Sequence, residues 1–376
     1  MSGEMTKFAV GSMNISMTEK FTRIITSSVD GALEEQCRNI LGRIDNEYIV
    51  ISIVYFYVAA DTNAYMSNDV ILHSVTASFF SECPLVSCVA QRPMSGRLVA
   101  EVVYMKDSAV IERHEDYLLF RSDGCEELLT QGIHFPLAGD IGEQSAKVFD
   151  RIGNILDSES FAVSDIVRQW NYIDHITAVN SGVQNYQLFN DARSDFYSSA
   201  HWSNGYPAAT GIGCDAGCVT VVVYAVKGFK GADRPIDNPL QIPAHKYSGK
   251  VLASGREVVR TTPKFERGRL LGDTVFVSGT AAIKGENSEF SNDARMQAFE
   301  AIDVVEHLVK PSNISKDCSG FRFDLMRVYV RHTLDMETVR DVFISHFGNI
   351  PIHFLTADIC RPELLLELEG IGRAFH

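Results

Sequence analysis

The stretch TADICRPELLLELEG, residues 356–370, sets the pattern on which the predicted fold of this chain rests. An arginine-proline turn is followed by a run that predicts a β-strand, in which successive side chains point to opposite faces. Glu367 and Glu369 then share one face of this strand, and Leu366 and Leu368 share the other.

The two glutamates have two possible interpretations. A carboxylate among leucines is costly to ionise when it is buried, so its pKa rises towards neutrality. A general acid needs that property. The alternative is that Glu367 and Glu369 face water from a half-exposed antiparallel strand.

Length and charge limit the classes of protein. The chain has 376 residues, which favours two domains over one. Its net charge of -14 argues against nucleic-acid or anionic-membrane partners. An acidic protein that binds an acidic metabolite needs locally placed arginines. No apolar run approaches the roughly 20 residues that span a bilayer, and the first residues lack the order of a signal peptide. We therefore expect a cytoplasmic protein.

The eight cysteines are scattered, and we expect free, mostly buried thiols. The pairs Cys83/Cys88 and Cys214/Cys218 lack a clear second pair of ligands nearby, and the eleven histidines show no HExxH spacing. The sequence therefore predicts neither a metal site nor a cofactor.

A linker candidate divides the chain. Residues 228–246 (GFKGADRPIDNPLQIPAHK) cluster Gly, Pro and Asp between two regular regions. We place the boundary there, which gives an N-terminal domain of residues 1–230 and a C-terminal domain of residues 231–376. Near the start, residues 48–58 (YIVISIVYFYV) predict a strong strand.

The two halves repeat one order of elements, namely strand, helix, strand, helix, proline turn and closing strand. Gln144 and Gln297 occupy matching places in the helices, and Pro207 and Pro351 occupy matching places in the turns. The pattern predicts an α+β fold: two tandem β-α-β units with helices on one face of mainly antiparallel sheets, plus an N-terminal extension.

One difference between the copies bears on function. Glu367 stands sixteen residues after Pro351, whereas Val223 stands sixteen residues after Pro207. An acid in only one copy indicates one site per chain and favours the functional interpretation of Glu367.

The second half resembles the reactive-intermediate imine deaminases of YjgF type. The matching segments are VFVSGTAAI, the helix with Gln297, VRDVF and HFGNIP, and the closing LELEG. The deaminases carry an arginine just after the proline of the closing turn, where it grips the substrate carboxylate. Here Ile352 and His353 follow Pro351, so simple amino-acid-derived imines lose their anchor.

The two-copy arrangement is similar to the chorismatase family over roughly residues 100–372. The segments that carry this resemblance are FNDARSDFY with GYPAATGIG, PAHKY with PKFERG, SGTAAI, and ADICRPELLLELEG. The resemblance implies two YjgF-like units that split chorismate into pyruvate and a ring product. It also implies that Glu367 is the general acid that protonates the enol ether. Water or a ring hydroxyl then captures the cation, without metal or cofactor.

Chorismate carries two carboxylates, and arginine side chains can bind such groups through two hydrogen bonds each. The candidate arginines are Arg193, Arg267 and Arg340. Arg193 and Arg340 could instead be solvated helix charges, and Arg267 could cap a loop. Arg361 is interpreted as a turn residue.

The other predicted contacts to substrate come from smaller groups and tyrosines. Tyr206 and Tyr247 could bind a hydroxyl or carboxylate, although Tyr206 also suits a partly buried aromatic. The glycine-rich loop that ends at Gly213 would offer backbone N–H groups. Ala281 and Cys360 are expected to line the pocket, where their size would bear on which nucleophile attacks.

Two other functions stay open: an imine or enamine deaminase, and a non-catalytic metabolite-binding protein. The sequence does not decide between a hydroxybenzoate and a dihydroxycyclohexadiene carboxylate as the ring product. It does not decide between a monomer and a homo-oligomer either, since YjgF-type trimers have an interface that fused units could satisfy internally.

Overall fold

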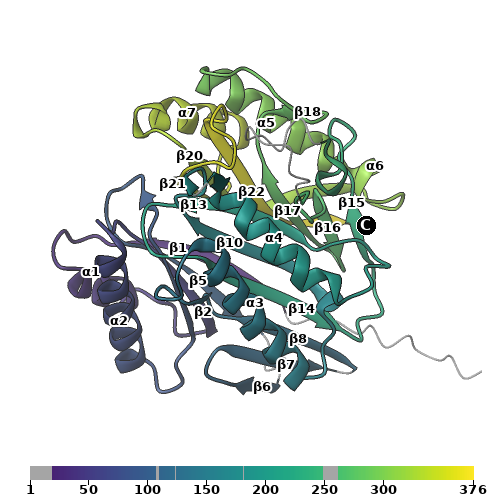
Figure 1. Ribbon diagram of the computed structural model, residues 1–376. Helices are drawn as coiled ribbons and strands as arrows, with labels where there is room; N and C mark the ends of the chain where they lie inside the picture. Colours follow the sequence, from purple (N-terminus) through teal and green to yellow (C-terminus); the bar gives the residue numbers. More distant parts are fainter. Residues whose placement is uncertain (1–18, 107–109, 123, 181, 249–260) are drawn as a thin grey trace, which may run out of the picture.

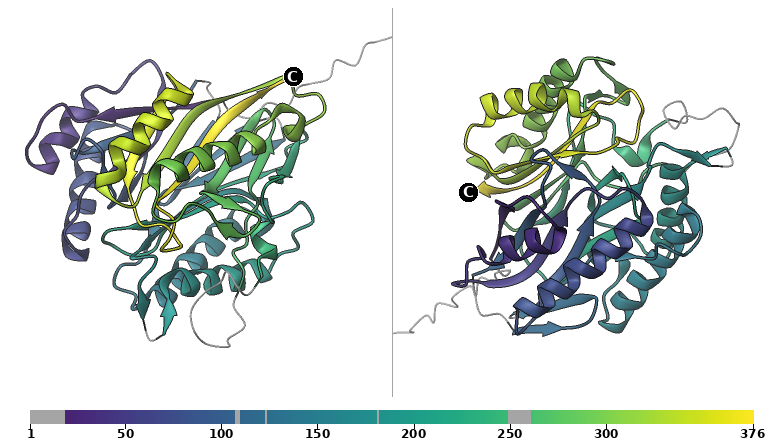
Figure 2. Two further views of the ribbon diagram at one scale, coloured as in Figure 1. Left: turned by 90° about the horizontal axis from the view of Figure 1, so that it is seen from above. Right: turned by 90° about the vertical axis from the view of Figure 1, so that its left-hand side faces the viewer.

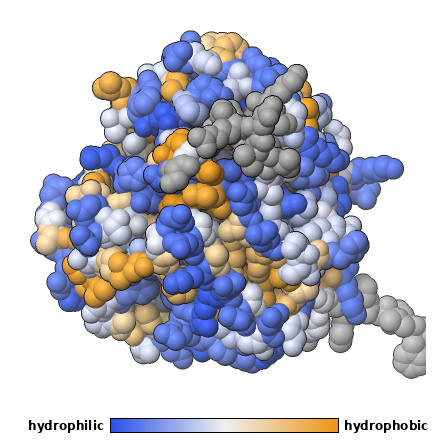
Figure 3. Space-filling model, in the orientation of Figure 1, coloured by the Kyte–Doolittle hydropathy of each residue, from blue (hydrophilic) through white to orange (hydrophobic). Residues whose placement is uncertain are grey.

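The computed structural model describes residues 19–106, 110–122, 124–180, 182–248 and 261–376 (Figure 1). The described chain forms three units of mixed helix and sheet, and antiparallel pairs outnumber parallel ones. The helices lie on the outside, and the sheets face the interior (Figures 1 and 2). Hydrophilic side chains cover most of the face in Figure 3. Among the described residues, no helix is long and apolar enough to cross a membrane.

The first unit is a four-stranded sheet with two helices, in the strand order β1-β5-β2-β3. A short strand, β4 (Arg92–Pro93), leaves this unit and pairs with β21 of the third. The elements are β1 (Lys20–Thr26), α1 (Leu33–Leu41), β2 (Ile49–Phe56), α2 (Thr62–Phe79), β3 (Leu85–Val89) and β5 (Val99–Met105).

The second unit has the strand order β13-β10-β14-β8-β7-β6, and β9 also pairs with β14. A capping box between Asp140 and Glu143 starts its helix α3. The elements are β6 (Val110–Arg113), β7 (Tyr117–Ser122), β8 (Cys125–Thr130), β9 (Ile133–His134), α3 (Ile141–Ser158), β10 (Ile166–Asp174), the hairpin β11 (Val179–Asn180) and β12 (Val183–Gln184), α4 (Asn185–Ser198), β13 (Ala208–Cys214) and β14 (Thr220–Lys227).

The third unit has the strand order β15-β16-β17-β22-β20-β21. Asp293 caps α5 by accepting a hydrogen bond from the Met296 N–H. The elements are β15 (Asp233–Ile236), β16 (Gly268–Leu271), β17 (Thr274–Thr280), the hairpin β18 (Ile283–Lys284) and β19 (Asn287–Ser288), α5 (Ala294–Leu308), α6 (Pro311–Ile314), β20 (Gly320–Val330), α7 (Met336–Phe347), β21 (Ile352–Thr356) and β22 (Leu366–Phe375).

All three units share one topology. In each, a helical crossover joins two parallel strands, β2 to β3, β10 to β13 and β20 to β21. The closing strand, β5, β14 or β22, lies next to the first strand of that parallel pair and runs antiparallel to it. Its neighbour on the other side, β1, β8 or β17, is antiparallel to it as well. The predicted α+β fold with tandem units is confirmed. The N-terminal extension, which the sequence left unmatched, has the same order of strands.

Matching residues of the three units meet at the centre. Phe56, Tyr172 and Tyr329 belong to one buried cluster. Their parallel-strand partners Val89, Ile212 and Leu355 belong to it too. These pairs set the correspondence between the units. Opposite the three aromatic residues, the closing strands carry Val99, Thr220 and Glu367.

Candidate active site

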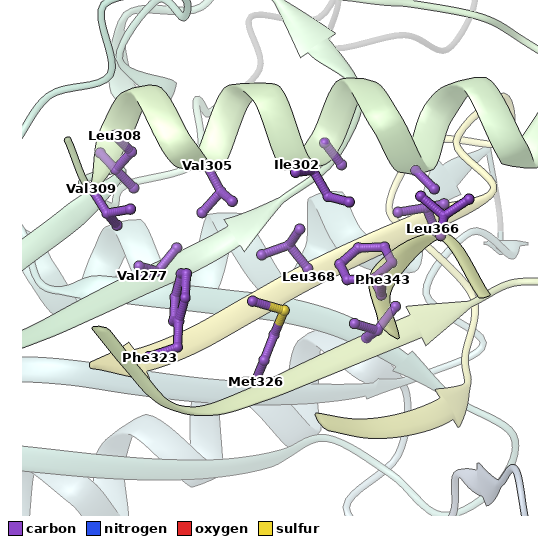
Figure 4. Packing of buried hydrophobic residues seen from close by; sticks show 14 of the residues in the cluster. Val277, Ile302, Val305, Leu308, Val309, Phe323, Met326, Phe343, Leu366 and Leu368 are labelled. Atoms are coloured by element: carbon purple, nitrogen blue, oxygen red, sulfur yellow. The ribbon is translucent and has the colours of Figure 1, made fainter. Parts of the chain in front are cut away.

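The closing strand β22 turns its leucines and its glutamates to opposite faces, as predicted. Leu366 and Leu368 pack with Ile302 and Val305 of α5 in the core of the third unit (Figure 4). Glu367 and Glu369 point the other way, and they are 5% and 2% exposed. The alternative in which both carboxylates face water is therefore wrong.

The comparison with Val223 needs a correction. Val223 belongs to the cluster that packs against the helices of the second unit, so it lies on the opposite face from Glu367. The matching residue is Thr220, because it pairs with Tyr172 as Glu367 pairs with Tyr329. Counting from the proline missed this, because the connection from β13, which ends at Cys214, to β14, which begins at Thr220, is shorter than the one from β21, which ends at Thr356, to β22, which begins at Leu366. Thr220 carries no carboxylate either, so the asymmetry between the copies remains.

Glu369 is the ionised member of the pair. Burial raises its pKa, but Arg327 and Arg168 outweigh that effect, and the net shift is downward. Arg327 Nη1 and the Tyr329 hydroxyl each donate to Glu369 Oε1 at 2.7 Å. Arg168 and the Thr210 hydroxyl donate to Oε2. A carboxylate with four donors is fixed as an anion.

The same network reaches the first unit. Arg327 also donates to both carboxylate oxygens of Glu101, at 2.7 to 3.0 Å. His353 Nδ1 lies 2.8 Å from Glu101 Oε1. Burial raises the pKa of Glu101, but Arg327 and His353 have the larger, opposite effect. The net result is a pKa of about 2, below the usual value of a glutamate. Residues from all three units are therefore joined by buried charges next to Glu367.

Glu367 has the opposite environment. Burial raises its pKa to about 8, and the negative charge of Glu369 adds to the shift, while Arg267 and Arg168 oppose it. At neutral pH its carboxyl is therefore mostly protonated. Gly279 leaves room for this group, because a Cβ there would lie 2.0 Å from Glu367 Oε1. Two carboxyls with divergent pKa values are the arrangement from which acid catalysis is built.

Glu367 lines a cavity of about 130 Å³ between the second and third units. Helix α4 contributes Arg193, which is buried and donates to Asn190 Oδ1 at 2.6 Å. Arg267, just before β16, is also buried and donates to the Ile242 carbonyl at 2.7 Å and to the Tyr247 hydroxyl. Within the described residues neither arginine forms an ion pair, and the Nε of each lacks a hydrogen-bond partner. Two buried cations beside a cavity suit an anionic ligand.

Three uncharged residues that the sequence predicted as substrate contacts also line this cavity: Tyr247, Ala281 and Cys360. Burial, followed by the charge of Glu367, raises the pKa of the Cys360 thiol to about 12. The thiol is thus neutral at physiological pH and unsuited to act as a nucleophile.

The structure places three predicted contacts elsewhere. Arg340 lies on the exposed face of α7 and pairs with Glu337 at 2.8 Å. Tyr206 stacks on Tyr197, with ring centroids 5.9 Å apart, and does not line the cavity. The backbone N–H of Gly213 is already engaged, since it donates to the Asp358 carbonyl at 2.8 Å. These three residues are removed from the candidate site.

The sequence analysis missed several residues of the site. Arg361, interpreted as a turn residue, lines the cavity, and its guanidinium lies 5.3 Å from the Tyr247 ring centroid. Its place next to Cys360 was the available signal. Arg168 and Arg327 were overlooked within predicted strands, where an arginine between apolar neighbours indicates a buried charge that needs a partner. The cavity is further lined by Gln184, Tyr186, Gln187, Asn190, Ala209, Gly211, Pro263, Phe265, Ile283, Pro362, Glu363 and Leu364.

Comparisons with known proteins find similar sequences. Residues 102–225 match the family model described as chorismatase FkbO/Hyg5-like, N-terminal. The chain is 28% identical to a 3-hydroxybenzoate synthase of Streptomyces hygroscopicus over 278 residues, which cover 72% of this chain and 80% of the relative. It is also 28% identical to a chorismatase of Streptomyces rapamycinicus, over 60% of this chain and 67% of the relative.

The fold matches a solved structure over nearly its whole length. A crystal structure of a chorismatase superposes with a TM-score of 0.72 at 21% identity, and the match covers 95% of this chain and 99% of the other. The resemblance to the chorismatase family that the sequence motifs indicate is thus confirmed.

Proposed function

We propose that this protein is a chorismatase, an enzyme that cleaves the enolpyruvyl ether of chorismate to pyruvate and a ring product. The observation that carries the proposal is Glu367, a carboxyl with a pKa near 8 that lines a cavity beside two buried arginines. The chorismatase and 3-hydroxybenzoate synthase relatives support the choice of substrate.

Proton transfer opens the reaction. Glu367 donates its proton to the terminal methylene carbon of the enol ether, and the double-bond electrons form the new C–H bond. The adjacent carbon becomes an oxocarbenium-like cation, and the carboxylate left on Glu367 stabilises it. The ionised Glu369 keeps the pKa of Glu367 high before the transfer. General acid catalysis of this kind typically contributes 10² to 10⁴-fold to the rate.

Capture of the cation completes the cleavage. If water adds, it returns a proton to Glu367, and the hemiketal collapses to pyruvate and a dihydroxycyclohexadiene carboxylate, with one water consumed. If the neighbouring ring hydroxyl attacks instead, its oxygen bonds to the ring carbon that bears the ether, and the C–O bond of that carbon breaks with its electron pair going to pyruvate. The hydroxyl proton returns to Glu367, and the resulting epoxide opens and loses a ring proton to give a hydroxybenzoate, with no water consumed. Ala281 and Cys360 line the space in which the nucleophile must sit.

The two substrate carboxylates need cationic partners. We assign this role to Arg193 and Arg267, with Arg361 at the side of the cavity where Pro362 and Glu363 also lie. The free Nε of Arg193 and of Arg267 gives each guanidinium spare capacity to donate. Tyr247 sits between Arg267 and Arg361 and is placed to hydrogen-bond the ring hydroxyl or a carboxylate.

The test is incubation of the purified protein with chorismate, assay of pyruvate, and identification of the ring product by chromatography. We expect Glu367→Gln to lower kcat by about 10² to 10⁴-fold. Glu337→Gln, which changes an exposed glutamate on α7, is the matched control and should leave kcat unchanged.

Other outcomes would indicate a different function for this protein. Absence of pyruvate with folded protein would remove the proposal. Ammonia release from dehydroamino acids would indicate an imine deaminase. Chorismate binding without turnover, equal in wild type and Glu367→Gln, would indicate a metabolite-binding module.

A further inference from the structure

A second cluster of reactive side chains lies between the first and second units, away from the Glu367 cavity. Asp69 and His73 stand one turn apart on α2, and Cys88 lies on β3. One ligand atom from each of these residues lies within 4.8 Å of those of the other two. His134, on β9 of the second unit, faces the same carboxylate.

The distances suit a metal site with three protein ligands. His73 Nε2 lies 3.6 Å from Asp69 Oδ1, and zinc bonds of about 2.0 to 2.3 Å place neighbouring tetrahedral ligand atoms about 3.3 to 3.7 Å apart. The His73 imidazole, the Asp69 carboxylate and the Cys88 thiolate would supply three ligands, and the fourth tetrahedral position would be left to water. His134 Nε2 lies 3.7 Å from the other oxygen, Asp69 Oδ2, and stands beside the site.

One detail of the cluster points to a cation. Asp69 Oδ1 is buried without a hydrogen-bond partner among the described residues. His134 Nδ1 lies 3.0 Å from the Gly132 carbonyl, to which it donates, and His134 Nε2 faces the other oxygen, Asp69 Oδ2. Asp69 Oδ1 is thus left to the ion.

The charges of the ligands also balance that of the ion. Asp69 and a deprotonated Cys88 supply two negative charges, which a divalent ion neutralises, while the His73 imidazole binds in its neutral form. Burial raises the pKa of the Cys88 thiol, so the metal must displace its proton. His73 is half-buried at the surface of α2, which gives an ion a route in from solvent.

The location is the counterpart of the Glu367 cavity in the repeated fold. His134 pairs with Thr220, the residue that matches Glu367. Cys88 matches the cavity-lining Gly211, because each precedes by one position the central residue of its strand, Val89 or Ile212. Helix α2 of the first unit lies beside the second unit, just as α4 of the second unit lies beside the third.

We infer that Asp69, His73 and Cys88 form a binding site for Zn²⁺ on the first unit, where it faces His134 of the second. This inference does not depend on the proposed catalytic activity. The ion ties α2 to β3.

The test measures metal directly in the full-length protein. Wild type is loaded with ZnCl₂, dialysed against metal-free buffer and assayed for zinc by mass spectrometry. Replacement with Co²⁺ then reports the geometry and the sulfur ligand through its visible and thiolate charge-transfer bands. We expect one zinc per chain, a tetrahedral cobalt spectrum, and a Tm that falls when a chelator strips the metal.

Variants assign the ligands. Cys88→Ser should abolish the thiolate-to-cobalt band, and His73→Ala, at the half-buried edge of the cluster, should lose stoichiometric zinc even if Cys88→Ser does not fold. Cys125→Ser, which changes a buried cysteine outside the cluster, should retain one zinc. Wild type that holds no zinc after loading, or equal zinc in wild type and both ligand variants, would overturn the inference.

Discussion

The two interfaces between consecutive units have the same architecture and carry different chemistry. Between the second and third units, Glu367 and Ala281 face α4 across a cavity. Between the first and second units, Thr220 and His134 hold the matching strand positions and face α2. A repeated scaffold therefore supplies the same place twice, and a few side chains decide what it does.

A second contrast lies within β22 itself. Glu367 and Glu369 are two residues apart on one face, yet their pKa values move in opposite directions. Glu369 has four donors and is an anion, whereas Glu367 borders a cavity and keeps its proton. The Glu369 carboxylate is held by the protein, whereas the Glu367 carboxyl stays open to a ligand in the cavity.

The largest expected effect comes from neutralising the structural carboxylate. Glu369→Gln leaves the buried Arg168 and Arg327 without their shared counter-ion, so the free energy of unfolding should fall by about 3 to 5 kcal/mol. Urea denaturation monitored by circular dichroism measures the loss. Glu367→Gln is the matched control and should show no such loss near pH 7. Equal destabilisation by both substitutions would break the contrast.

The next effect concerns substrate binding across the cavity. Arg267→Gln removes a buried cation, and a charged hydrogen bond is worth about 1.5 to 3 kcal/mol, so KM for chorismate should rise roughly 10 to 100-fold. The pKa of Glu367 should also rise, because Arg267 lowers it. Steady-state pyruvate assays report both. Arg340→Gln, on the exposed face of α7, should match wild type, and a similar rise in KM there would refute the assignment.

The most gradual effect is the pH dependence of stability. The folded pKa of Glu367 lies above its unfolded value, so the native state holds the extra proton between about pH 4.5 and 8. Its contribution to stability is fully present below this window and is lost as pH rises through it. The slope is at most about 1.4 kcal/mol per pH unit. Unfolding curves of wild type minus Glu367→Gln should show this slope, and a flat difference would contradict it.

The sequence was sufficient for the repeated α+β fold because alternation and proline turns are local signals. The position of Glu367 could be predicted for the same reason. Glu367 and Glu369 are two residues apart on a strand, so their side chains lie on the same face. The sequence analysis did not predict that the first unit repeats the same topology, because no matching motif marks its turns. The register of the second unit could not be predicted either, as the correction from Val223 to Thr220 shows, because the length of the connection between β13 and β14 has no clear signature in one sequence.

The remaining site residues depend on contacts between distant segments. Arg340 and Arg193 both occupy helices, and only packing shows that one is exposed and the other buried. The partners of Arg327 come from Glu101 and Glu369, which are far apart in the chain. The proposed zinc site likewise joins α2 and β3, so its spacing matches no short motif.

The pH profile of kcat/KM for pyruvate release tests the central claim most directly, because it reports the ionisation of the free enzyme. Glu367 must hold its proton to act, so activity should persist through neutral pH and fall about tenfold per pH unit above about pH 8. Loss of activity between pH 4 and 5 as pH rises would show an ordinary exposed carboxyl at Glu367, and would contradict the account.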